Sequence, residues 1–68
     1  MSGLSDEERR ELLRIEESGG YLETLLDNEP DAIIRLIEEG YLDCRQHVFD
    51  WVFLRISDKG YATIRAMK

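Results

Sequence analysis

The stretch IIRLIEEGYL, residues 33–42, marks the point where the chain changes from one kind of secondary structure to another. Before Gly40 the apolar residues recur at helical spacing, which places Ile33, Leu36 and Ile37 on one side of a helix. A glycine after the last periodic residue is typical of a helix end, because glycine adopts the left-handed cap conformation without strain. After Gly40 the apolar residues alternate with polar ones, as they do in a strand. The sequence therefore predicts a helix that ends at Gly40 and a strand that follows it.

Two antiparallel strands are expected after this helix, over residues 41–45 and 51–56. The side chains expected to point inward from them are those of Leu42, Cys44, Val52, Leu54 and Ile56. Because successive side chains of a strand alternate between its faces, Trp51, Phe53 and Arg55 are expected on the opposite face. The intervening residues 45–50 are then expected to form the tip of a hairpin.

Two more helices are expected before Pro30, which itself suits the first position of the helix that ends at Gly40. Ser5 and Glu8 have the spacing of a capping box, so a first helix is expected to start there and to run to the residue before Gly19. Apolar residues at positions i, i+1, i+4 and i+5 then predict a short second helix that ends near residues 27–28. Its apolar face consists of Tyr21, Leu22, Leu25 and Leu26.

The last helix is expected to begin at Ser57, whose hydroxyl can accept a hydrogen bond from the first turn. Helical spacing then turns Tyr61, Ile64 and Met67 toward the core. The predicted order of elements is three helices, two strands and a final helix.

In this order the residues resemble the winged-helix superfamily. Residues 33–42 are similar to the end of the family's recognition helix entering the first strand of the wing, and LRISDKG, residues 54–60, is similar to the second wing strand entering the closing helix. The resemblance covers residues 5–68 and is to small prokaryotic, archaeal or viral regulators. It implies an α+β fold with three helices, a two-stranded wing hairpin and a C-terminal helix, all in a single domain over residues 1–68.

Composition restricts the location and the partners that we expect. The 68 residues have a formal net charge of −6, contain one cysteine, and contain no apolar stretch long enough for a membrane span. With no signal-peptide pattern at the N-terminus either, a cytoplasmic protein is expected. Residues 1–39 hold four basic and twelve acidic residues, a formal charge of −8, whereas residues 40–68 hold five basic and three acidic residues, a charge of +2. An acidic protein is repelled by nucleic acid, so the basic back half is where an anionic partner is expected to bind.

The resemblance implies double-stranded DNA as a partner, because the recognition helix of DNA-binding members enters the major groove. The exposed side of the corresponding helix carries Arg35, which can bind a guanine or form a salt bridge with an acidic neighbour. Those neighbours are Asp31, Glu38 and Glu39. The remaining candidate contacts are Arg45, Gln46 and His47 at the hairpin tip, with Arg55 and Lys59 close by in sequence. The alternative is that these polar residues are simply solvated.

The aromatic residues Trp51 and Phe53 have two interpretations, as part of the core or as a surface through which two copies associate. Cys44 is expected to be a small buried hydrophobic residue. One cysteine and one histidine, His47, provide too few ligands for a zinc site, and nothing indicates a catalytic group or a cofactor.

Two functions follow, neither of them enzymatic. The first is a dimeric DNA-binding protein similar to transcription regulators, which makes its contacts through the wing and Arg35. The second is an acidic protein-interaction module or inhibitor, in which Asp31, Glu38 and Glu39 bind a basic protein partner or mimic the charge of DNA. The resemblance favours the first function and the net charge favours the second.

Overall fold

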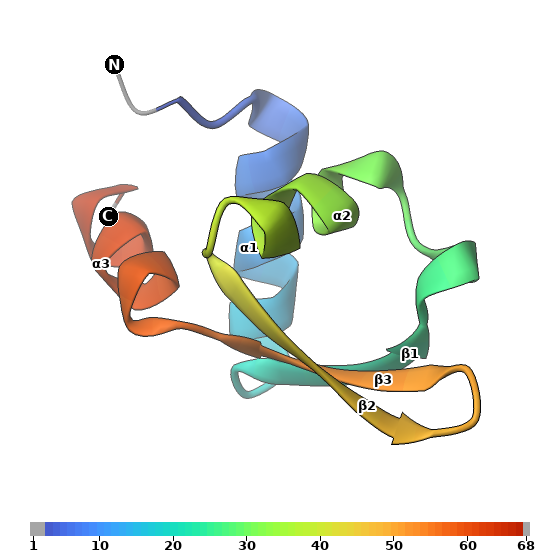
Figure 1. Ribbon diagram of the computed structural model, residues 1–68. Coiled ribbons are helices and arrows are strands. Elements are labelled where there is room, and N and C mark those ends of the chain that lie inside the picture. The colour runs from blue at the N-terminus through green and yellow to red at the C-terminus, as the bar shows by residue number, and fades with distance from the viewer. Residues whose placement is uncertain (1–2, 68) are drawn as a thin grey trace.

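Three helices and a three-stranded antiparallel sheet form an α+β fold (Figure 1). The computed structural model describes residues 3–67, except for the side chains of Gln46 and His47. The elements in chain order are α1 (Asp6–Glu17), β1 (Tyr21–Leu25), the 3-10 turn η1 (Leu26–Asn28), α2 (Asp31–Glu38), β2 (Leu42–Val48), β3 (Trp51–Ile56) and α3 (Asp58–Met67).

The sheet has the order β1-β3-β2, so the last strand in sequence lies between the other two. All three helices lie on the same side of this sheet, and its other face is uncovered (Figure 1). The core lies between the helices and the covered face. Its largest fully buried side chains are Leu12, Ile15, Ile33, Leu36, Leu42 and Leu54.

The expected strand pairing after Gly40 is confirmed. β2 and β3 pair in antiparallel orientation with Leu42 opposite Ile56 and Cys44 opposite Leu54. Val52, Leu54 and Ile56 are buried as expected. The helix that ends before this hairpin is also confirmed, because Gly40 has a φ of +85° directly after the cap of α2. Pro30 is the N-cap of α2 rather than its first residue, so the helix begins one residue later than predicted.

The predicted second helix is wrong, because residues 21–25 form the strand β1. Gly19 and Gly20 both have positive φ, at +98° and +91°, and redirect the chain from α1 onto the edge of the sheet. Tyr21 then pairs with Arg55 and Leu25 pairs with Trp51. A short run of apolar residues fits both a helix and a strand, so pairing with the distant strand β3 decides its conformation. The described residues therefore form three α-helices and three strands, besides η1, rather than the four helices and two strands expected.

The hairpin is longer than predicted, since β2 extends to Val48 and the turn consists of Phe49 and Asp50. Arg45 therefore lies within a strand, opposite Phe53, and not at the tip. The expected burial of Cys44 is also wrong, because this side chain is exposed. The helices cover β2 only near its start, and the rest of this edge strand extends beyond them (Figure 1).

The helix α3 packs closely on Tyr41, the residue directly before β2. Ser57 caps α3 as predicted, because its Oγ accepts a hydrogen bond from the Gly60 backbone N–H at 3.1 Å. Ile64 is buried, but Tyr61 remains 38% exposed rather than turned into the core. A Cβ atom on Gly60 would lie 2.3 Å from the carbonyl oxygen of Tyr41, so only glycine allows this approach.

The capping box at the start of α1 is confirmed, and it also fixes a buried charge. The Ser5 backbone N–H donates to Glu8 Oε1 at 2.9 Å, and the Glu8 N–H donates to Ser5 Oγ at 3.2 Å. Glu8 is 4% exposed, and its Oε2 lies 3.7 Å from Nε of Arg35 on α2. The hydrogen bond from Ser5 lowers the pKa of Glu8, and the positive charge of Arg35 lowers it further against the opposing effect of burial. The contact between Glu8 and Arg35 links the first turn of α1 to α2.

We expect Gly60→Ala to destabilise the protein by about 1–3 kcal/mol, the usual cost of forcing extra atoms into a packed site. In an unobstructed helix the same change is stabilising by up to about 1 kcal/mol. The free energy of unfolding from urea titration measures the effect, with Ala62→Gly on the exposed side of α3 as a control for helix propensity alone. A Gly60→Ala variant at least as stable as the wild type would contradict the close contact with Tyr41.

We expect Glu8→Gln to destabilise the protein at neutral pH and to have little effect in acid. The folded-state pKa of Glu8 is lowered, so its charge stabilises the fold above its ordinary pKa of about 4.5 and this stabilisation is lost as pH falls through the folded-state pKa. Glutamine keeps a capping oxygen and removes only the charge. Melting temperatures of wild type, Glu8→Gln and the exposed control Glu17→Gln should be compared from neutral pH to pH ~3. A constant difference between wild type and Glu8→Gln across this range would refute the role of the charge.

Candidate functional site

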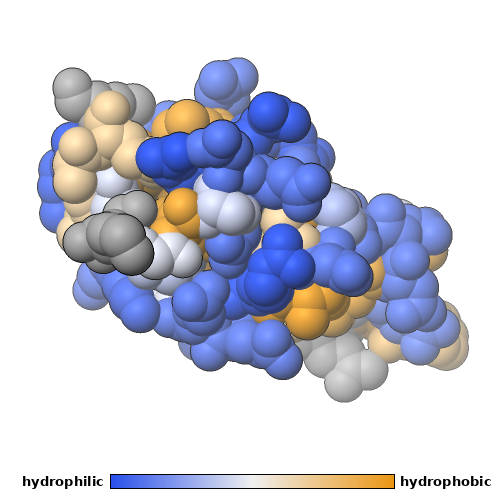
Figure 2. All heavy atoms as spheres, turned by 90° about the horizontal axis from the view of Figure 1, so that it is seen from above, coloured by the Kyte–Doolittle hydropathy of each residue, from blue (hydrophilic) through white to orange (hydrophobic). Residues whose placement is uncertain are grey.

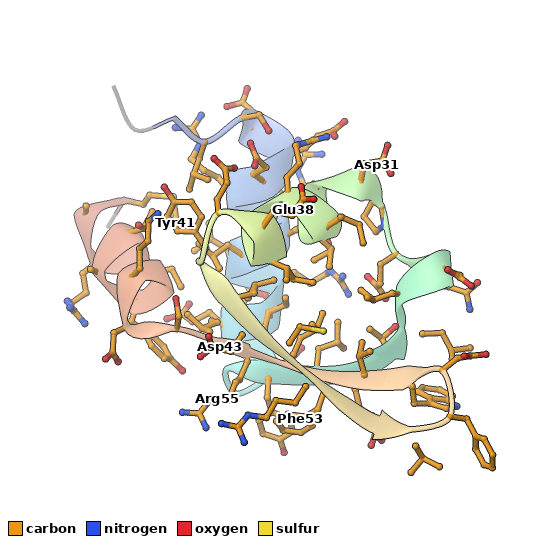
Figure 3. All side chains as sticks on the ribbon, viewed as in Figure 1. Asp31, Glu38, Tyr41, Asp43, Phe53 and Arg55 are labelled. Atoms are coloured by element: carbon orange, nitrogen blue, oxygen red, sulfur yellow. The ribbon has the colours of Figure 1, made fainter. Side chains whose placement is uncertain are left out.

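On the uncovered face of the sheet, nine residues with described side chains lie in three rows, which we call the open face. In each row, residues of β1, β3 and β2 stand side by side in the strand register. The rows are Tyr21, Arg55 and Asp43; Glu23, Phe53 and Arg45; and Leu25, Trp51 and Val48. Figure 3 shows Phe53 and Arg55 pointing away from the helices. The open face therefore combines one apolar row with two rows that contain an aromatic ring and charges of both signs.

The aromatic residues of the open face are not part of the core, although a core position was the first interpretation of Trp51 and Phe53. Trp51 is 43% exposed and Tyr21 is 55% exposed. The rings of Tyr21 and Phe53 stack with centroids 5.4 Å apart and an angle of 17° between their planes. At the end of the hairpin, Val48 is 46% exposed and Phe49 is 85% exposed. Exposed apolar side chains thus gather on one side of the molecule.

Of the six residues predicted to contact DNA or another partner, the structure describes the side chains of four and separates them. Arg45 and Arg55 lie on the open face, in adjacent rows next to Phe53. Arg35 is on the helical side, with its guanidinium 3.7 Å from Glu8 and 3.9 Å from Glu7. Lys59 donates to the backbone carbonyl of Glu39 at 2.7 Å and its Nζ is 4.4 Å from the centre of the Tyr41 ring. The predicted contacts of Gln46 and His47 concern side chains that lie outside the described residues.

The helical side of the molecule is more polar than the open face. Seen from above, its surface is mostly hydrophilic, with only small apolar areas (Figure 2). Asp31, Glu38 and Glu39 are all exposed on and directly after α2. Arg35 contacts acids of α1 rather than Asp31, Glu38 or Glu39, which were its expected partners. The outer side of α2 is therefore dominated by negative charge.

Two concave regions lie beside these surfaces. A cleft of about 270 Å³ adjoins the Gly20 end of the open face, between the aromatic rings of Tyr21, Phe53 and Tyr61 and next to Arg55. A groove of about 630 Å³ separates α1 from α3. Its charged lining includes Arg9, which forms an ion pair with Asp6 in the same groove. Only the cleft continues the open face.

The described residues form no cluster of three or more His, Cys, Asp or Glu side chains that could hold a metal ion. Within the same part of the chain, no helix has both the length and the apolar character needed to cross a bilayer. The side chains of the open face themselves offer apolar contact, aromatic stacking and charges of both signs.

Three residues of the open face were missed because β1 was predicted as a helix. They are Tyr21, Glu23 and Leu25. The signal that points to a strand is the alternation in YLETL after Gly20, in which Leu22 and Thr24 turn toward the helices and the other three residues turn outward. Burial agrees with this pattern, because Thr24 is buried and Tyr21 and Glu23 are exposed.

The chain matches no protein-family model, no curated protein sequence and no solved structure.

Proposed function

We propose that the protein is a non-catalytic protein-binding domain of the winged-helix type, and that its open face makes the contact. Support for the winged-helix type comes from the order of elements, in which α2 leads into the β2-β3 hairpin and the hairpin leads into α3. The region before α2 departs from the expected pattern, because it holds the 3-10 turn η1 and β1 instead of a helix.

The observation that carries this proposal is the exposure of large apolar side chains on one uncovered sheet face. Tyr21, Trp51 and Val48 are each more than 40% exposed there, although the core is built entirely from other residues. Grouped apolar side chains on a protein surface mark sites of protein association. Aromatic residues are also enriched at the centres of such interfaces, where they provide much of the binding energy.

The distribution of charge favours a protein partner over DNA. The open face contains Arg45 and Arg55, but also Glu23 and Asp43, so its formal charge is zero. On α2, Arg35 is held beside Glu7 and Glu8, and Glu38 is exposed on the same helix. Binding to the DNA backbone requires a surface on which positive charges neutralise several phosphates. Neither surface has that excess of positive charge.

We expect the wild-type protein to show no appreciable binding to a labelled DNA duplex at low salt. The variant Glu38→Lys/Glu39→Lys changes the formal net charge from −6 to −2 and should gain weak, salt-sensitive binding without sequence preference. Fluorescence anisotropy of the labelled duplex measures both. If instead the wild type binds and Arg45→Ala abolishes that binding, the protein is a DNA-binding domain and the proposed function is wrong.

In a capture experiment, the tagged wild-type protein should retain its protein partners, including untagged copies of the chain itself. We expect the tagged Trp51→Ser/Phe53→Ser variant to retain none of them. The two substitutions remove apolar area from the open face and leave the core intact. Quantitative mass spectrometry after cross-linking compares this variant with wild type and with the Glu38→Lys/Glu39→Lys variant, which alters only the helical side. Loss of the same partners in the helical-side variant, together with their retention in the open-face variant, would place the contact on the helices and overturn the proposal.

A further inference from the structure

We propose that the partner of the open face is a second copy of this chain, with the two β3 strands packed on one another about a two-fold axis parallel to the strands. This inference rests on the proposed function, because it names the partner of the same surface. The observation behind it is the placement of opposite charges on either side of the central aromatic ring.

The middle row of the open face has Phe53 at its centre, Glu23 on the β1 side and Arg45 on the β2 side. A two-fold axis parallel to β3 exchanges the β1 side of one copy with the β2 side of the other. It therefore places Glu23 of each copy opposite Arg45 of its partner and Phe53 opposite Phe53. Two ion pairs then enclose a pair of aromatic rings.

The same operation brings together an apolar row and a row with one like-charged pair. In the apolar row Leu25 faces Val48 and Trp51 faces Trp51, so this row is apolar throughout. In the third row Tyr21 faces Asp43, and the phenol O–H can donate to the carboxylate. Arg55 faces Arg55, but each guanidinium has Asp43 next to it in the strand register. Two sheets packed in this way lie about 10 Å apart, with their strands at about 30°, as in a β-sandwich.

The charges also select this arrangement over the other two-fold packing of the same faces. An axis across the strands, through the middle row, would place Glu23 opposite Glu23 and Arg45 opposite Arg45. Like charges that face each other in an interface oppose association. A closed pair of copies with parallel β3 strands is therefore the arrangement that fits both the apolar row and the middle row.

Charge reversal tests the inference, because the two single reversals are complementary. Glu23→Arg places two positive charges opposite each other, and Arg45→Glu places two negative charges opposite each other. Each variant alone should associate at least tenfold more weakly than wild type, measured by sedimentation velocity over a range of concentrations. An equimolar mixture of the two variants should form mixed dimers with near wild-type affinity, since positions 23 and 45 again face each other with opposite charges. The double variant Glu23→Arg/Arg45→Glu should also regain wild-type association.

The mixture serves as the control for folding, because variants that do not fold cannot form the mixed dimer. As a matched control, Glu38→Lys reverses a charge on the helical side and should leave association unchanged. A wild type that stays monomeric at millimolar concentration overturns the second copy as partner, while the capture experiment decides the proposed function independently. A wild-type dimer that both single reversals leave intact overturns the arrangement about β3, as does a mixture that associates no better than its components.

Discussion

The pairing of β3 with strands on both of its sides is the constraint on which the rest of the structure depends. β3 joins β1, which comes directly after the first helix, to β2, which comes directly after the second. Its inward residues, with Leu54 completely buried, form the floor on which the helices pack. Its outward residues form the middle of the open face. One strand therefore determines both the core and the surface to which we assign the function.

Features that depend on neighbouring residues could be predicted from the sequence. The capping box of Ser5 and Glu8 spans one helical turn, and the end of α2 at Gly40 follows from a single glycine. The alternation of residues 52–56 also predicts correctly which of them are buried, because these residues lie in the central strand and their inward side is covered by helices. Cys44 has the same inward position in an edge strand, beyond the helices, and alternation alone does not reveal that difference.

Two features that depend on distant residues were not predicted. β1 has a sequence that fits a helix as well as a strand, and its partner β3 is far along the chain. The ion pairs of Arg35 likewise join α2 to the start of α1, although acidic residues nearer in sequence were available. These two contacts determine which residues belong to the candidate site. The first adds Tyr21 and Glu23 to a surface with Phe53 and Arg45, and the second directs Arg35 toward carboxylates instead of an external anion.

The order β1-β3-β2 leaves β1 and β2 as the two edge strands of the sheet. Exposed edges are the usual sites at which sheets grow sideways into open-ended fibres, and charged side chains on an edge oppose such growth. Here Glu23 lies on one edge strand, and Asp43 and Arg45 lie on the other, while Trp51 and Phe53 belong to the strand between them. Trp51 and Phe53 are thus set back from both edges. In the arrangement that we propose, two copies stack once through this face and the charged edge strands oppose further growth, which favours a finite assembly over a polymer.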